Sequence, residues 1–346
     1  MRKHRFLYCA IAFLLCAALS AAPPQGGGQR VVAIGDIHGD MDAFVGILQR
    51  AQLIDPVKRW SGGRATVVQT GDFLDRGPNA RGVMDLLITL QRDAQRGGGR
   101  LVVLMGNHEA MNIFGDLRYV ADRDYGSYAA DTSEKGKSKV DASKPEGFAE
   151  RCEAFGPDGK YGKWLRSLPA IARVNDSIFL HGGLSPEVAS ASVEKLNEAI
   201  AAEIKRFDEL KQFMVSKRIA QPCDTLDELK AAAKTALDKA KGKDAETLKA
   251  FLGLGGWLSM HEKGPLWFRG YAQWTDAEGQ PLIQQLIEAF GVTRFVVGHT
   301  PQQSGQILSR FNGQIYLIDT GMLSSYYPGG RAAALNIQDG KISFIY

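Results

Sequence analysis

The stretch VVAIGDIHGD at residues 31–40 sets the pattern of the whole chain. Its four apolar residues suit a buried strand, and the chain then turns at glycines beside an aspartate and a histidine. Two later stretches repeat this arrangement, ATVVQTGDFLDRG at residues 65–77 and LVVLMGNHE at residues 101–109. Apolar residues with helical spacing lie between them, over 41–53 and 81–92. This repetition predicts a parallel α/β sheet whose polar loops gather at one edge.

Three further glycine motifs complete the set. They are His181-Gly182-Gly183 after the apolar run at 177–180, Arg269-Gly270, and Gly298-His299-Thr300 after the run at 294–297. The chain has six histidines, and four of them (His38, His108, His181 and His299) lie in the glycine motifs. Aspartate, histidine and asparagine together suit divalent ions of the Mn, Fe or Zn kind. Two such ions about 3.5–4 Å apart commonly promote in-line attack on phosphorus.

The ordered set of motifs resembles the calcineurin-like metallophosphoesterases. HGGLSP at residues 181–186 and GPLWFRGY at residues 264–271 make it most similar to phosphoprotein phosphatases of the bacterial type called Shewanella-like. The resemblance covers residues 31–346. It implies an α/β fold, a two-sheet β-sandwich flanked by helices, with a helical insertion that we interpret as a cap. It also implies a dinuclear-metal phosphatase that hydrolyses phosphate monoesters by attack of a metal-bridging hydroxide.

The resemblance also implies a role for each motif residue. Asp36 and His38 would bind the first of two divalent ions, Asp72 would bridge both, and Asn107, His181 and His299 would bind the second. His108 would protonate the leaving oxygen while Asp75 orients its ring. Arg76, Arg269 and Asn107 would bind the phosphoryl group, for which a planar guanidinium is better suited than lysine. Tyr271 either contacts phosphate or packs in the core.

Several substrate classes remain open. A phosphoprotein carrying Ser, Thr or Tyr phosphate is the leading hypothesis. A nucleotide hydrolase similar to diadenosine tetraphosphatases and a small-molecule phosphatase are the alternatives. A non-catalytic metal-binding module is disfavoured, because binding alone needs no leaving-group acid such as His108. Residues 319–323, DTGML, stand where eukaryotic Ser/Thr phosphatases carry Ser-Ala-Pro-Asn-Tyr, so the substrate preference of those enzymes does not transfer.

The N-terminus predicts export. Basic residues at 2–5 precede an apolar run at 6–19 that is shorter than the roughly 20 residues of a spanning helix, and small residues follow. We interpret residues 1–22 as a signal peptide, with an uncleaved anchor as the alternative, and expect a periplasmic protein without stable membrane insertion. Removal of Arg2, Lys3 and Arg5 lowers the formal net charge from +4 to +1. Such a near-neutral chain lacks the basic surface of a nucleic-acid binder.

The remaining sequence predicts one catalytic domain with two insertions. Residues 23–30 form a Pro/Gly-rich linker, and residues 31–346 form the metallophosphoesterase domain, interrupted at about 115–164 and 186–262. The first insertion is polar, includes the lysine-rich run 135–139, and predicts irregular structure. The second predicts helices near 193–213 and 225–252. Cys152 and Cys223 are the two cysteines that remain after signal removal, and they either pair or stay free.

Overall fold

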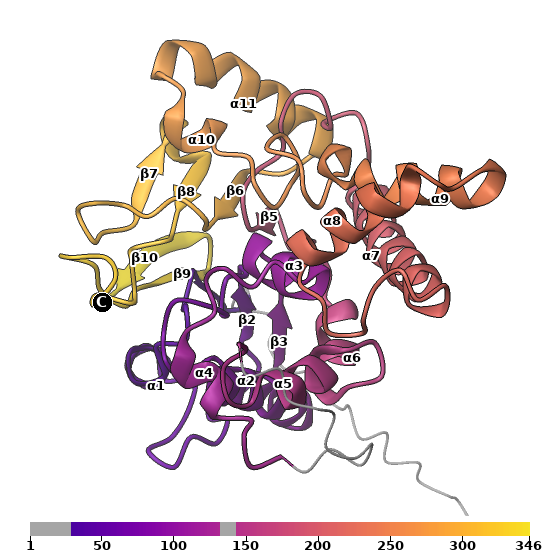
Figure 1. Cartoon of the computed structure of the whole chain (residues 1–346). Coiled ribbons are helices and arrows are strands. Elements are labelled where there is room, and N and C mark those ends of the chain that lie inside the picture. Colours follow the sequence, from indigo (N-terminus) through magenta and orange to yellow (C-terminus); the bar gives the residue numbers. More distant parts are fainter. Residues whose placement is uncertain (1–28, 132–142) are drawn as a thin grey trace, which may run out of the picture.

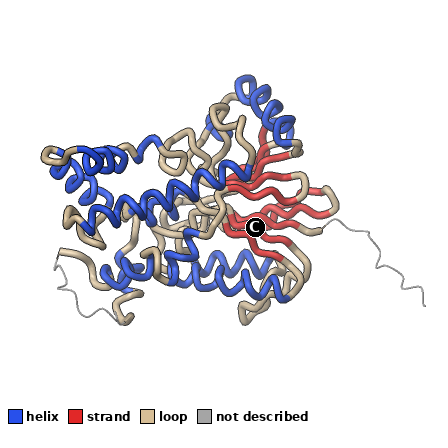
Figure 2. Tube along the Cα trace, turned by 90° about the vertical axis from the view of Figure 1, so that its right-hand side faces the viewer, coloured by secondary structure: helices blue, strands red, loops and turns tan. Residues whose placement is uncertain are grey.

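Two five-stranded sheets face each other, and helices cover their outer faces (Figures 1 and 2). The computed structural model describes residues 29–131 and 143–346. The predicted signal peptide, most of the linker and the lysine-rich run 135–139 lie outside the described residues. Within the described part, no helix is both long and apolar enough to cross a membrane.

The first sheet has the strand order β10-β9-β1-β2-β3. Its parallel strands are the three predicted from the opening motifs: β1 (Val31–Ile34), β2 (Thr66–Gln69) and β3 (Arg100–Val103). The helices α1 (Met41–Arg50) and α2 (Ala80–Arg96) connect them. Each helix begins with a polar cap, because the side chains of Asp40 and Asn79 accept hydrogen bonds from backbone N–H groups of the first turn.

The second sheet has the order β4-β5-β6-β8-β7, and its three central strands are parallel. They are β5 (Ser177–Leu180), β6 (Arg294–Val297) and β8 (Ile315–Leu317). The edge strands β4 (Ile171–Val174) and β7 (Leu308–Arg310) were not predicted, since each contains an arginine and lacks the continuous apolar run of the central strands.

One feature of the C-terminal region corrects the sequence analysis. Short apolar runs at residues 332–337 and 341–346 predict antiparallel strands in a second sheet, and the structure forms β9 (Ala334–Gln338) and β10 (Lys341–Ile345) over these residues. Instead, β9 pairs antiparallel with β1 and so extends the first sheet. The physical reason is that β2 occupies only one edge of β1, and β9 hydrogen-bonds to the other edge.

Successive side chains of a strand point to opposite faces of the sheet, and they therefore belong to two separate parts of the core. In β1, Val31 and Ala33 pack between the sheets, together with Phe179 and Val296 of the second sheet. Val32 and Ile34 point the opposite way into a larger core shared with the helices. Because both faces of β1 are buried, all four of its residues are apolar, as the opening stretch predicted.

The first insertion is more regular than expected. It contains the helices α4 (Asp122–Gly126), α5 (Phe148–Phe155) and α6 (Lys160–Arg166). Its polar composition hid these helices because they are short and bury only a few residues each, such as Arg151 and Phe155 in α5. Cys152 of α5 forms a disulfide with Cys223, with 5.8 Å between the Cα atoms, and thus connects the two insertions.

The second insertion is helical, as predicted. It holds α7 (Val193–Ser216), α8 (Leu226–Leu237) and α9 (Gly242–Leu252), so the predicted segment 225–252 is two helices divided just before Gly242, where φ is 53°. α7 packs on α3 (Asn107–Phe114) and on β4 at the flank of the sandwich (Figure 1). α10 (Gly270–Gln273) and α11 (Asp276–Phe290) follow. The contacts with the predicted ligand His299 come from Trp267 and Arg269, which follow α9 in the chain. The role of α7–α9 as a cap therefore stays a prediction.

Candidate metal centre

The ends of five parallel strands bring all the predicted metal ligands together. Asp36 and His38 follow β1, Asp72 follows β2, Asn107 follows β3, His181 follows β5 and His299 follows β6. Each of these side chains is buried, with no more than 4% of its residue surface exposed. Both sheets therefore contribute to one site, mainly oxygen ligands from the first and imidazoles from the second.

Two clusters of possible ligand atoms share Asp72. One cluster is His38, Asp72 and His108, and the other is Asp72, His181 and His299. Oδ2 of Asp72 lies 3.2 Å from His181 Nε2 and 3.8 Å from Nε2 of both His38 and His108. A carboxylate between two such clusters has the position that a bridging ligand requires.

The cluster around His181 has acceptor atoms facing one another. Nε2 of His181 lies 2.9 Å from Oδ1 of Asn107 and 3.0 Å from Nδ1 of His299. The outer ring nitrogens, His181 Nδ1 and His299 Nε2, donate to the carbonyls of Thr70 and Trp267 at 2.9 and 3.0 Å. This hydrogen-bond network assigns the ring protons to the outer nitrogens, so both lone pairs point inward. Lone pairs that converge on an amide oxygen and a carboxylate fit a cation, with backbone carbonyls orienting the rings.

His38 is oriented in the same way. Its Nδ1 donates to the carbonyl of Leu74 at 2.9 Å, and its Nε2 faces Oδ2 of Asp36 at 3.9 Å. Burial lowers the pKa of His38 and of His299 well below the usual histidine value, which favours the neutral imidazole that a metal requires. The guanidinium of Arg76 contacts Nε2 of His38 and so lies beside the acidic residues Asp36 and Asp72.

The site is also crowded with carboxylates. Burial raises the pKa of Asp36 well above its usual value, and the neighbouring Asp319 and Asp72 raise it further. Asp319 follows β8 and was not singled out in the sequence; its Oδ2 has no donor among the described residues. Buried acceptors in excess of donors need positive charge. The residues present therefore fit two divalent ions of the kind predicted from the sequence.

Glu109 holds the loops of the site in place. Its carboxylate accepts hydrogen bonds from the backbone N–H groups of Asp72, Phe73, Leu74 and Gly106, at 2.7 to 3.2 Å. The loops approach so closely that a Cβ on Gly71 would lie 2.4 Å from the backbone nitrogen of Gly106. Glu109 stands inside the motif at residues 106–109, but its supporting role depends on contacts that the sequence does not show.

Left-handed backbone conformations are concentrated in the same loops. His38, Asp72 and His299 have φ values of 48°, 56° and 68°, and Asp75 and Arg76 have 66° and 65°. Such conformations are uncommon for residues other than glycine and tend to occur at functional sites, where the surrounding structure enforces them.

His108 and Asp75 form a buried hydrogen-bonded pair. Nδ1 of His108 lies 2.6 Å from Oδ2 of Asp75, and Asn112 donates to the other oxygen of Asp75 at 2.9 Å. Although burial acts in the opposite direction, Asp72 and Asp75 raise the pKa of His108. A protonated His108 suits a general acid. The position of its Nε2 near Asp72 is also compatible with a ligand to the first ion, so its role stays a prediction.

The two predicted phosphate-binding arginines lie beside the clusters. Arg269 donates to the carbonyl of His299 and to Oγ1 of Thr300, at 2.8 and 3.1 Å. Arg76 donates to the hydroxyl of Tyr327, and its guanidinium lies over the rings of Tyr119 and Tyr326 at 5.6 and 5.1 Å. The sequence analysis did not single out these three tyrosines, which lie far from the motifs along the chain.

Tyr271 packs in the core, the second of its two predicted roles. It is 1% exposed, and its hydroxyl accepts a hydrogen bond from the backbone N–H of Leu184 at 3.1 Å.

Residues 29–303 match the family model of the calcineurin-like phosphoesterases. The chain belongs to this family. An uncharacterised protein of Schizosaccharomyces pombe is 35% identical over 91% of this chain and 79% of its own length. The Shewanella-like protein phosphatase 1 of Plasmodium berghei is 27% identical over 91% of this chain and 74% of its own length. The crystal structure of the cold-active protein tyrosine phosphatase of a psychrophilic Shewanella species superposes with a TM-score of 0.62 at 27% identity, covering 92% of this chain and 80% of that chain.

These findings confirm the predicted family and fold. They identify the chain as a metal-dependent phosphatase, and its similarity to the Shewanella-like branch extends over most of its length. The metal identity and the roles of individual residues stay predictions.

Proposed function

We propose that the chain is a phosphoprotein phosphatase that works with two divalent ions. The observation that carries this proposal is the placement of Asp72 between two ligand clusters and beside the His108–Asp75 pair. Asp36, His38 and Asp72 would hold one ion, and Asp72, Asn107, His181 and His299 the other. When bound, two such ions activate water and neutralise charge on a phosphoryl group. Manganese is the ion that we propose first.

The remaining residues would act on the substrate itself. His108 is placed to donate its Nε2 proton to the leaving oxygen, while Asp75 fixes the ring through Nδ1. The guanidinium groups of Arg76 and Arg269 would bind the phosphoryl oxygens, as would the amide of Asn107. A protein that only bound metal would need neither the acid nor the arginines.

An aromatic surface beside Arg76 favours phosphotyrosine among phosphoprotein substrates. Tyr119 and Tyr326 are 39% and 50% exposed, although both rings lie close to the Arg76 guanidinium. Exposed aromatic faces next to a phosphate-binding arginine can pack against the phenyl ring of a phosphotyrosine, which phosphoserine lacks. The similar Shewanella structure is that of a protein tyrosine phosphatase.

A panel of substrates with added manganese tests this proposal. Two peptides of the same sequence, one with phosphotyrosine and one with phosphoserine, are compared with diadenosine tetraphosphate and a small sugar phosphate. We expect the highest kcat/KM for the phosphotyrosine peptide, and a reduced preference in Tyr326→Leu. Faster turnover of the dinucleotide would support the nucleotide hydrolase instead, and faster turnover of the sugar phosphate would support the small-molecule phosphatase.

We further propose that the protein is exported and works in the periplasm. The support is the sequence pattern of residues 1–22 together with the Cys152–Cys223 disulfide, a bond typical of oxidising compartments. Fractionation with N-terminal sequencing tests this. A cytoplasmic protein that keeps residues 1–22 would contradict it.

A further inference from the structure

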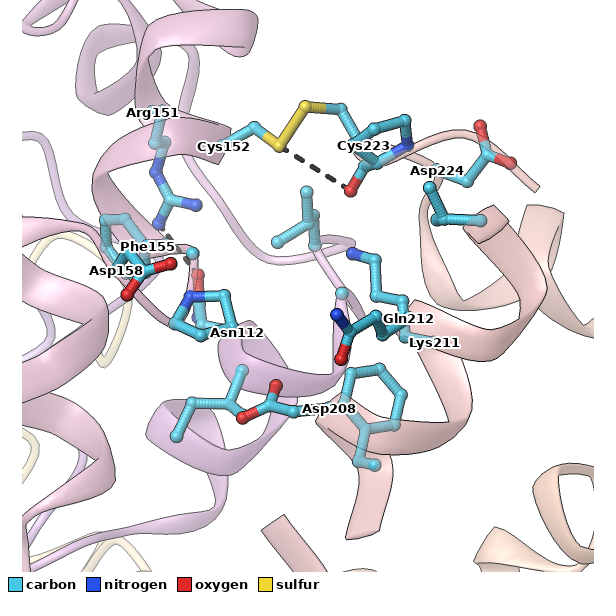
Figure 3. A pocket seen from close by; sticks show the side chains of 18 of the residues that line it. Asn112, Arg151, Cys152, Phe155, Asp158, Asp208, Lys211, Gln212, Cys223 and Asp224 are labelled. Atoms are coloured by element: carbon cyan, nitrogen blue, oxygen red, sulfur yellow. Dashed lines mark hydrogen bonds between the residues drawn. A yellow bond between two sulfur atoms is a disulfide. The ribbon is translucent and has the colours of Figure 1, made fainter. Parts of the chain in front are cut away.

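A cavity lies between the two insertions, apart from the metal centre. It has a volume of ≈ 620 Å³ and opens between α5 and α7, with the Cys152–Cys223 disulfide among its walls (Figure 3). This volume is within the range of sites that bind small molecules. The six sequence motifs contribute none of its charged lining residues.

Lys211 of α7 supplies a cation without a counter-ion in this cavity. Figure 3 shows its ammonium group pointing into the cavity, while the carboxylate of Asp224 points away. Among the described residues, Lys211 makes no hydrogen bond or ion pair. The neighbouring Asp208 is already committed, since both of its oxygens accept from Arg166 at 2.8 and 2.9 Å. Burial lowers the pKa of Lys211, although the carboxylates of Asp208 and Asp224 act in the opposite direction.

The other walls suit the apolar part of a ligand. Leu117, Phe148 and Val215 line the cavity and are half-buried, so part of each side chain stays accessible. The lining also includes the exposed Lys205 and the carboxylate of Asp158, while Arg151 and Arg166 are paired with Asp124 and Asp208. The inward-pointing ammonium of Lys211 beside apolar side chains matches a monoanion with an apolar body. A dianion would lose more hydration there than one ammonium could offset.

The cavity is connected to the catalytic pair by buried hydrogen bonds. Arg151 and Asn112 line it, and Nη2 of Arg151 donates to Oδ1 of Asn112 at 2.7 Å. Asn112 donates in turn to Oδ1 of Asp75 and to the carbonyl of His108, both at 2.9 Å. All four side chains are nearly inaccessible to solvent. A displacement of Arg151 therefore reaches the ring of His108 through two intervening side chains.

We propose that this cavity is an effector site. It binds a small organic monocarboxylate with an apolar body, whose carboxylate meets the Lys211 ammonium, and its occupation changes turnover through Arg151 and Asn112. The effector site is separate from the metal centre, and its occupant need not carry phosphate.

Binding is tested with 4-phenylbutyrate and its neutral amide, using calorimetry on the metal-loaded protein. We expect the acid to bind at least about tenfold more tightly than the amide, the worth of one charge-assisted hydrogen bond. Lys211→Met should bind both compounds equally weakly. Lys195→Met, which changes an exposed lysine on the same helix, should behave as wild type. Absence of saturable binding of either compound up to about 10 mM, or full affinity of Lys211→Met for the acid, would overturn the proposal.

Coupling is tested by steady-state hydrolysis of an aryl phosphate with and without saturating 4-phenylbutyrate. We expect kcat/KM to change about fivefold in wild type and in Lys195→Met, within the usual range of coupling between sites. The effect should disappear in Lys211→Met. Turnover that is unchanged at saturation, or changed equally in Lys211→Met, would contradict an effector role.

Discussion

The loops of the metal centre and the junction between α5 and α7 both bury charged side chains, but they balance these charges differently. At the junction, Arg151 is bonded to Asp124 and Asn112, and Arg166 is bonded to Asp208. At the metal centre, three carboxylates and three imidazole lone pairs converge, and the guanidinium groups of Arg76 and Arg269 lie beside them. Buried charges that pair within the protein stabilise structure, whereas buried acceptors in excess mark where cations belong.

The largest effect on the metal centre is expected from a substitution of Asp72. We expect Asp72→Asn to lose bound metal and nearly all activity, because a neutral amide cannot hold two cations close to each other. Metal analysis and turnover with manganese measure both effects. Asp176→Asn, which changes an exposed aspartate paired with Arg294, is the matched control. Two retained ions with turnover within about tenfold of wild type would refute the bridging role.

His108 provides the next largest expected effect. His108→Asn should slow hydrolysis of alkyl phosphates such as phosphoserine by about 10²–10⁴-fold, the usual contribution of a general acid. Aryl phosphates should be affected less, because their leaving groups need little protonation. His261→Asn serves as the control. Equal losses on both substrate types, accompanied by loss of metal, would make His108 a ligand instead.

Arg269 tests whether the geometry of a cation matters as well as its charge. Arg269→Lys keeps the charge but loses the planar guanidinium, so we expect a higher KM and a lower kcat/KM. Arg76→Lys should behave in the same way, and Arg294→Lys, whose guanidinium pairs with the exposed Asp176 away from the metal centre, should not. Kinetics of Arg269→Lys that match wild type would leave Arg269 with a purely structural role, through its bonds to His299 and Thr300.

The disulfide should have the smallest effect on activity. Cys152→Ser combined with Cys223→Ser removes the bond between the insertions but leaves every strand-end residue in place. On the chain-entropy model we expect unfolding to become easier by about 4 kcal/mol at most. Denaturant unfolding measures this, and metal content should stay unchanged. A loss of metal in the double variant would show that the disulfide helps to hold the metal centre.

Removal of metal should lower both the activity and the thermal stability of the protein. A chelator leaves Asp36, Asp72 and Asp319 buried without their cations, so we expect the melting temperature to fall and to recover when manganese is restored. The Asp72→Asn variant should show a smaller shift. A melting temperature that chelation leaves unchanged would mean that the site does not hold metal in the folded protein.

The sequence predicted the two-sheet fold and the strand ends at which the proposed metal ligands lie, but it missed the edge strands β4 and β7. Asp36, Asp72 and Asn107 follow apolar runs and glycines, so their place at the strand ends followed from local pattern alone. The strand before Asp319 was predicted at residues 314–318, but Asp319 was missed as a member of the site because no histidine or arginine stands beside it in a motif. The connection from Arg151 to His108 was also missed, since its partners are far apart in sequence and polar side chains carry no periodic signal for burial. The disulfide stayed open because residue spacing does not determine the distance between two Cα atoms.

The proposed catalytic centre requires two ions, one on either side of Asp72. Anomalous diffraction from crystals grown with manganese measures this directly. We predict two peaks about 3.5–4 Å apart, one beside Asp36 and His38, the other beside Asn107, His181 and His299, with Asp72 between them. A single peak, or two peaks that Asp72 does not touch, would contradict the account.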